Sequence, residues 1–285
     1  MTEMLSYLGE MLTYPFMQRA FVAGILISIC ASLLGVSLVL KRYSMIGDGL
    51  SHVGFGALAV ASALHLAPLL VAIPVVILAA FVLLRLSENG KLKGDAAVAM
   101  FSTGALAIGV MVVSVTSGMN TDLNSYLFGS ILAMSRSDVV LSVILAAVVL
   151  ALYLLFYNQL FAVTFDPVFA RATGVKTGFF NVLLAVLTAV TVVLGMRMMG
   201  ALLISSLIIF PALTAMRVCR HYRAVILTAV LLSVSSFVAG MTVSFLFATP
   251  AGASIVVVDI IFTVISRLWG QLAPVSQMIY CANVT

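Results

Sequence analysis

Residues 49–84 contain no Asp, Glu, Lys or Arg, and this uncharged run limits the possible folds more than any other feature of the sequence. A transmembrane helix needs about 20 mostly apolar residues, so the run can hold two short spans. Similar runs recur along the chain, in which 64% of residues are hydrophobic and only 8% are charged. Soluble domains carry about 25% charged residues. The sequence therefore predicts an all-α, polytopic membrane helix bundle.

Nine runs with few or no charged residues are candidate spans when about 20 residues per span is taken as the guide. They lie at 20–40, 49–65, 67–84, 96–118, 139–158, 178–196, 198–216, 224–247 and 251–268. The second and third runs are short and lie close together, so either could be tilted, broken or partly re-entrant. We expect eight or nine transmembrane helices in a single domain covering residues 1–285.

Basic residues predict the orientation of the bundle. When successive loops are assigned to alternate sides, all Lys and Arg residues except Arg19, Arg136 and Arg197 fall on one side. This side is cytoplasmic by the positive-inside rule. The net charge of +5 is then an orientation signal within a lipid bilayer, and we expect no nucleic-acid partner. The N-terminus would lie outside, with residues 1–19 as an interfacial helix and residues 270–285 as an inner tail.

Asp48 and His52 stand at the start of the second predicted span, four residues apart and thus on one helix face. A carboxylate at the centre of a membrane helix costs at least about 2.5–3.5 kcal/mol, so such groups are usually functional. One interpretation is structural: Asp48 caps the helix and His52 bonds a neighbouring helix. The other is a metal-coordinating or proton-relaying pair. Glycines at 47, 49, 54 and 56 favour close packing of this helix against others.

The pair cannot form a complete transition-metal site, which usually has four or more ligands. Further ligands must come from other helices or a second subunit, and Asp259, Ser205 and Ser206 are candidates for extra ligands or pathway residues. Charge-based placement puts the pair toward the inner end of its span. Either the span is re-entrant, or the pair lies in the inner part of a pathway.

Residues 166–174 predict a short amphipathic helix between two spans: Asp166 can cap its start, Pro167 suits the first turn, and Gly174 can end it. It is either a solvated connector or a rigid knob that docks into a cytoplasmic partner. Pro211, within 200–211, predicts a kink or a broken helix, with Ser205 and Ser206 satisfying freed carbonyls. Residues 120–134 predict interfacial anchoring or docking of an external protein.

The sequence Lys-Arg-Tyr-Ser-Met-Ile-Gly-Asp-Gly-Leu-Ser-His at 41–52 resembles the signature of the permeases of zinc, manganese and iron ABC importers. The resemblance extends through 126–130, 166–174 and 200–215. It implies a type II ABC importer: two copies of this chain, two cytoplasmic ATP-binding subunits and an external metal-binding protein. It also implies that Asp48 and His52 are metal-pathway residues. Residues 166–174, including Asp166, Arg171 and Gly174, match the helix that couples to the ATPase.

The expected function is therefore import of a divalent transition metal, Zn²⁺ or Mn²⁺ or else Fe²⁺, across a prokaryotic-type plasma or inner membrane. We expect no permanently bound cofactor and no enzymatic activity in this chain, because the ATP-binding sequence GxxxxGK followed by Ser or Thr is absent from it. One rival is a permease for a metal chelate such as an iron-siderophore or cobalamin. Others are an ATP-independent metal carrier and an intramembrane metalloenzyme, although the metalloenzyme motif HExxH is absent.

Overall fold

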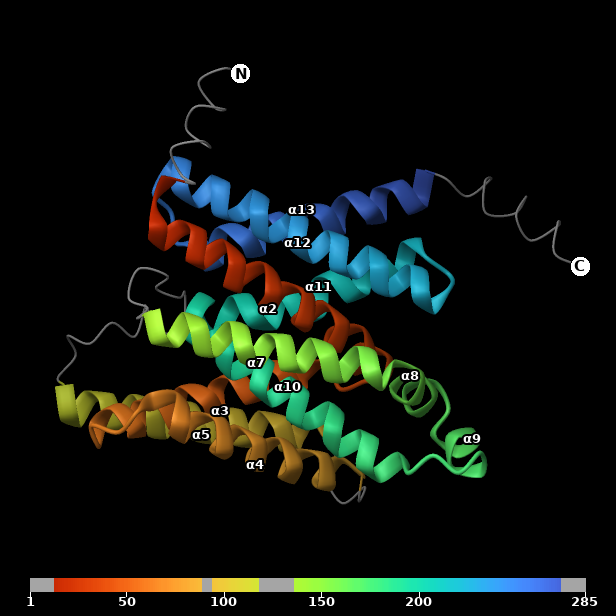
Figure 1. The fold of residues 1–285 in the computed structure, drawn as a ribbon, viewed down its shortest axis with the longest axis horizontal. Coiled ribbons are helices and arrows are strands. Elements are labelled where there is room, and N and C mark those ends of the chain that lie inside the picture. The colour runs from red at the N-terminus through yellow and green to blue at the C-terminus, as the bar shows by residue number, and fades with distance from the viewer. Residues whose placement is uncertain (1–12, 89–93, 118–135, 273–285) are drawn as a thin grey trace, which may run out of the picture.

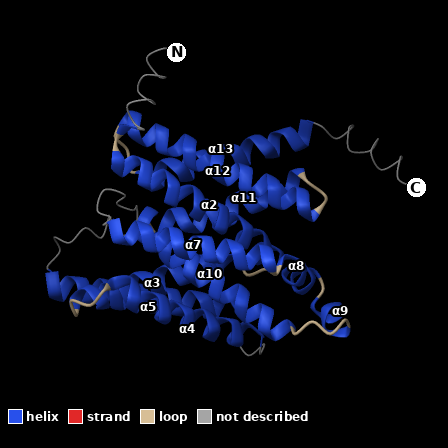
Figure 2. Ribbon diagram, in the orientation of Figure 1, coloured by secondary structure: helices blue, strands red, loops and turns tan. Residues whose placement is uncertain are grey.

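The computed structural model describes residues 13–88, 94–117 and 136–272, and these ranges form helices without a strand (Figures 1 and 2). The helices are α2 (Pro15–Leu40), α3 (Ser44–Ala63), α4 (Pro68–Glu88), α5 (Gly94–Ser117), α7 (Arg136–Leu155), α8 (Tyr157–Phe165), α9 (Pro167–Ala172), α10 (Thr177–Met199), α11 (Ala201–Val218), α12 (Tyr222–Phe247) and α13 (Ala251–Leu272). The predicted all-α bundle is confirmed.

Within the described ranges, seven helices are long and apolar enough to cross a membrane. The number is eight if α7 and α8, which are bent by 69°, form one broken span. Every predicted span overlaps a helix, but α3 is not among the seven because Asp48, His52 and its glycines make it less apolar. The second and third predicted spans correspond to α3 and α4, and each is one continuous helix, so neither span is broken.

The helices run lengthwise through the molecule, and the short helices α8 and α9 lie together at one end of it (Figure 1). The turn between α11 and α12, with Arg220, lies at the same end. This is the end that the charge pattern assigns to the cytoplasm, and we call it the inner end. The opposite end, where Gly200 joins α10 to α11, is called the outer end.

Helix α3 packs inside the bundle because its small residues allow neighbouring backbones to come close. A Cβ at Gly56 would lie 2.7 Å from the carbonyl oxygen of Ala105 in α5. A Cβ at Gly49 would lie 2.5 Å from the side chain of Val98 in the same helix. Such separations are available to glycine alone, so the prediction that this segment is buried among helices is confirmed.

The joint between α10 and α11 is a single residue, Gly200, with φ 91° and ψ 159°. This backbone conformation is essentially restricted to glycine. Helix α11 then continues without a break through Pro211, so the broken-helix alternative is wrong. Residues 1–12, 120–134 and 273–285, which carry the predicted interfacial helix, outer segment and most of the tail, lie outside the described residues.

Candidate functional site

Asp48 and His52 lie on one face of α3, as the sequence predicts. The distance from His52 Nε2 to Asp48 Oδ2 is 3.7 Å. The side chain of His52 is 22% exposed and that of Asp48 is 41% exposed. The pair is therefore packed into the bundle on one side and accessible on the other.

The structural interpretation of this pair is not supported. Helix α3 begins at Ser44, five residues before the predicted span, and its N-cap is Tyr43. Asp48 therefore lies within the helix and does not cap it. His52 Nδ1 is buried and has no hydrogen-bond partner among the described residues, so His52 is not held by a neighbouring helix through that atom.

Ser205 of α11 lies beside Asp48. Its hydroxyl oxygen is 3.2 Å from Asp48 Oδ1 and 3.1 Å from the carbonyl oxygen of Ala201, and its single proton can be donated to either. When Ser205 donates to Oδ1, it orients the carboxylate and leaves Oδ2 on the His52 side. The structure thus brings three predicted site residues together from two helices.

The contact with Ser205 also gives the depth of the pair. Asp48 is the fifth residue of α3 from the inner end, but Ser205 is the fifth residue of α11 from the outer end. At 1.5 Å per residue, Ser205 lies about 6 Å along α11 from its outer end. The next residue, Gly49, packs against Val98, the fifth residue of α5 from its inner end, so the pair lies toward the inner end of the bundle and α3 is one unbroken helix. The position toward the inner end that the charge pattern predicts is retained, and it is the first turn of α11, with Ser205, that begins within the bundle.

Ser206 points to a second carboxylate. Its hydroxyl oxygen lies 3.3 Å from Asp259 Oδ2 of α13, and the Ser236 hydroxyl of α12 lies near the same carboxylate. Asp259 is only 2% exposed. Within the described ranges no group of three or more His, Cys, Asp or Glu side chains could hold a metal, so Asp259 does not join Asp48 and His52 in one cluster. The two serines do not satisfy carbonyls freed by Pro211. Ser205 donates to the carbonyl of Ala201, and Ser206 donates to that of Leu203.

Helix α9 has the predicted capped form. Asp166 Oδ1 accepts hydrogen bonds from the backbone N–H groups of Val168 and Phe169, at 3.0 Å and 2.9 Å. Gly174 follows the helix with φ 86°, a left-handed conformation that favours glycine. The Arg171 side chain donates from Nε to the Thr177 hydroxyl at 2.8 Å. Asp166, Arg171 and Gly174 therefore shape this segment and fix it to α10.

The surface that α9 presents was not predicted from the sequence. Val168 is 77% exposed and Phe169 is 64% exposed, and Phe165 just before the helix is 68% exposed. Ala170 on the opposite face is fully buried. In the sequence, three large apolar residues beside a capped helix and outside the predicted spans are the pattern that could have indicated a protein-docking surface.

Residues 13–270 match the model of the ABC 3 transport family. The chain is 30% identical over 253 residues to the manganese import system permease ScaB of Streptococcus gordonii, covering 89% of this chain and 91% of that protein. It is also 30% identical over 247 residues to the high-affinity zinc uptake membrane protein ZnuB of Haemophilus influenzae, covering 87% and 95%. The chelated iron transport membrane protein YfeD of Yersinia pestis is 30% identical over 279 residues, covering 97% and 93%.

A solved structure with a similar fold is PsaBC from Streptococcus pneumoniae in complex with Fab. It aligns with a TM-score of 0.82 at 30% identity and covers 92% of this chain and 95% of that one. The all-α bundle of this chain thus has the permease fold of a type II ABC importer. The chain belongs to the ABC 3 transport family, the permeases of metal-ion ABC transporters, in which ATP is hydrolysed by separate subunits.

Proposed function

We propose that this chain forms, with a second copy of itself, the membrane pathway of an importer for a divalent transition metal, Zn²⁺ or Mn²⁺. The observation that carries the proposal is the accessible Asp48–His52 pair, 3.7 Å apart, inside an otherwise apolar bundle. A carboxylate oxygen and an imidazole nitrogen are ordinary ligands for both metals. Their position within the bundle suits a point that the metal passes rather than a surface site.

Ser205 supports this role because it orients the carboxylate. Partners that hydrogen-bond a ligand fix its geometry, and their loss commonly weakens metal affinity about 10- to 100-fold. Two chains related by a two-fold axis would supply two carboxylates and two imidazoles, which satisfies a four-coordinate ion. A site of this kind binds weakly enough to release its cargo, because no thiolate contributes.

Ligand chemistry and the relatives are compatible with more than one metal. Manganese, zinc and chelated iron transport proteins resemble the chain at the same 30% identity. Zinc accepts mixed oxygen and nitrogen ligands readily, and manganese prefers a larger share of oxygen. Competition among Zn²⁺, Mn²⁺ and Fe²⁺ during uptake decides which metal is carried.

We also propose that α9 is the docking site for a cytoplasmic ATP-binding subunit and that an external metal-binding protein delivers the cargo. The exposed Val168 and Phe169 provide an apolar contact of the kind that proteins bury when they associate. The buried Ala170 and the Asp166 cap keep the short helix rigid. A rigid knob can transmit force from its partner to the bundle.

The test is ATP-dependent uptake by the complex of permease, ATPase and binding protein in proteoliposomes. Asp48→Asn and His52→Gln are compared with His221→Gln, which changes an exposed histidine at the inner end. We expect each site variant to lose about 100-fold or more in uptake, because a two-residue site cannot tolerate loss of half its ligands. The control should transport normally. Normal uptake by either site variant, or uptake without ATP, would contradict the proposal.

A further inference from the structure

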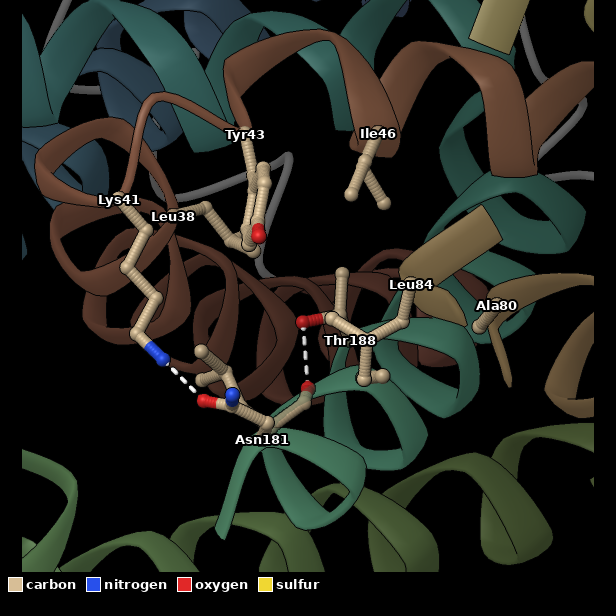
Figure 3. A pocket seen from close by; sticks show the side chains of 10 residues that line it. Leu38, Lys41, Tyr43, Ile46, Ala80, Leu84, Asn181 and Thr188 are labelled. Carbon is tan, nitrogen blue, oxygen red and sulfur yellow. Dashed lines mark hydrogen bonds between the residues drawn. The ribbon is translucent and has the colours of Figure 1, made fainter. Parts of the chain in front are cut away.

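The turn that joins α2 to α3 is tied to α10 by a side-chain bond. Lys41 Nζ donates a hydrogen bond to Asn181 Oδ1, and Figure 3 shows the Lys41 side chain reaching toward Asn181. Lys41 ends α2, and Asn181 is the fifth residue of α10 from the inner end. We call this bond the Lys41–Asn181 link. It crosses between two elements 140 residues apart in the sequence.

The space around the link is largely apolar. The pocket beside it is lined by Leu38, Tyr43, Ile46, Ala80, Leu84, Leu184, Ala185 and Thr188 together with the two linked residues (Figure 3). The Thr188 hydroxyl donates to the carbonyl oxygen of Leu184 in its own helix, so it does not join α10 to the turn. A hydrogen bond to an ammonium group is strong in such surroundings, and the incomplete packing leaves room for movement if the bond is lost.

Helix α10, which carries Asn181, is bonded to α9 at its first residue. Arg171 of α9 donates to the hydroxyl of Thr177, the first residue of α10, and Thr177 is buried. Thr177 and Asn181 are four residues apart and share one face of α10. Helix α9 packs against α8 and α10, and α10 packs against α2, α3 and α4. Helix α10 therefore lies between the exposed knob and the helix that carries the metal pair.

The turn itself is rigid enough to pass a displacement on to α3. The backbone N–H groups of Lys41, Arg42 and Tyr43 donate to the carbonyls of Ser37, Val39 and Leu38 at the end of α2. Ile46 in the first turn of α3 donates to the carbonyl of Tyr43 at 3.0 Å. Asp48 follows within α3, about one helical turn from its first residue.

We propose that Lys41 and Asn181 are positioning residues that couple movement of α9 to the position of Asp48 and His52. The contacts run from Arg171 to Thr177, along one face of α10 to Asn181, and across to Lys41 and the start of α3. This role deepens the proposed function and rests on it, because it concerns how ATP hydrolysis acts on the same metal pair. Neither residue is a proposed metal ligand.

The experiment measures metal uptake and ATP hydrolysis together in proteoliposomes that contain the whole complex, with Asp48 and His52 intact. The variants are Asn181→Ala and Lys41→Met, which remove the link from either side. Asn181→Asp retains the acceptor, and Asn158→Ala changes an exposed asparagine in α8 as a matched control. The readout is metal transported per ATP hydrolysed, because a loss of folded protein lowers uptake and hydrolysis in parallel and leaves that ratio unchanged.

We expect Asn181→Ala and Lys41→Met each to lower the ratio about fivefold or more, at the lower end of usual coupling between sites, while ATP hydrolysis stays within about twofold. The double variant should be no worse than either single one, since both remove the same bond. Asn181→Asp and Asn158→Ala should keep the wild-type ratio. An unchanged ratio in Asn181→Ala and Lys41→Met, a parallel fall of uptake and hydrolysis, or a multiplicative loss in the double variant would overturn the proposal. Failure of the proposed function is separate: it appears as normal uptake in Asp48→Asn, whatever the ratio in Asn181→Ala.

Discussion

Asp48 and Asp259 are two carboxylates placed beside consecutive serines of α11, yet their surroundings differ. Asp48 is 41% exposed in its side chain and has His52 for a neighbour. Asp259 is 2% exposed and is approached by the hydroxyls of Ser206 and Ser236. The α3 side of α11 therefore offers an accessible oxygen–nitrogen pair, whereas the α13 side offers an enclosed carboxylate among hydroxyls.

From this difference we expect two roles: Asp48 as a ligand of the metal, and Asp259 as a residue that stabilises helix packing. A ligand for a moving ion must be reachable, as the partly exposed side chains of Asp48 and His52 are. An enclosed carboxylate that accepts a hydrogen bond from Ser206 and lies near Ser236 instead helps to fix the packing of three helices. The following predictions test this division, beginning with the largest expected effect.

Replacing each carboxylate by its amide should separate the two sides most clearly. We expect Asp48→Asn to reduce metal uptake about 100-fold or more, and Asp259→Asn to change it less than about threefold, because an amide oxygen still accepts from Ser206. Uptake rates at equal amounts of folded protein provide the measurement. An equally large loss in Asp259→Asn would place that carboxylate in the pathway and end the comparison.

Two glycines allow the sides to be disturbed through packing. A Cβ at Gly35 would lie 2.1 Å from the carbonyl oxygen of Ile208 and displace α11, whereas one at Gly240 would lie 2.5 Å from the Cα of Ile255 in α13. Both Gly→Ala changes should lower the free energy of unfolding by about 1–3 kcal/mol. Gly35→Ala should also reduce uptake per folded molecule about tenfold, because a shift in α11 moves Ser205 away from Asp48.

Thermal unfolding in detergent and uptake per folded molecule, measured on the same preparations, check this prediction. Gly240→Ala serves as the control, since its clash falls on the α13 side. If both variants lost the same uptake per folded molecule, the two sides of α11 would contribute equally to transport.

The adjacent serines give a smaller and more local test. Ser205→Ala should raise the KM for metal about tenfold, because it frees the Asp48 carboxylate to rotate. Ser206→Ala should leave KM within about twofold and lower the free energy of unfolding by about 1 kcal/mol, since Asp259 loses a donor. Saturation curves for uptake, recorded with both variants, distinguish these outcomes. A reversed order of effects would exchange the roles of the two carboxylates.

The smallest effect is expected at Ala248, which precedes α13 with φ 51° and ends α12 in a left-handed conformation. Glycine adopts this conformation without the Cβ penalty, so Ala248→Gly should raise the free energy of unfolding by about 0.5–1 kcal/mol. Uptake should not change, because the α13 side supports rather than binds. A rise in the unfolding temperature together with altered uptake would contradict the expectation that uptake is unchanged.

Local features of the structure could be predicted from the sequence, and long-range contacts could not. The cap at Asp166, the end at Gly174 and the shared face of Asp48 and His52 depend on residues a few positions apart. The contact between Ser205 and Asp48 joins residues 157 positions apart. It depends on where α11 begins within the bundle, which hydropathy alone does not indicate. Hydropathy likewise gave no sign that Val168 and Phe169 would face outward, because apolar residues of spans and docking surfaces look alike in composition.

The Gly200 joint has a mechanical consequence. Helix α10 is fixed to the knob at its inner end, and α11 carries Ser205 near its outer end, with one residue between the two helices. A connection this short has no slack, so α10 cannot slide along its axis while α11 stays still. An axial movement of α10 must therefore rotate α11 about Gly200. This rotation shifts Ser205 relative to Asp48.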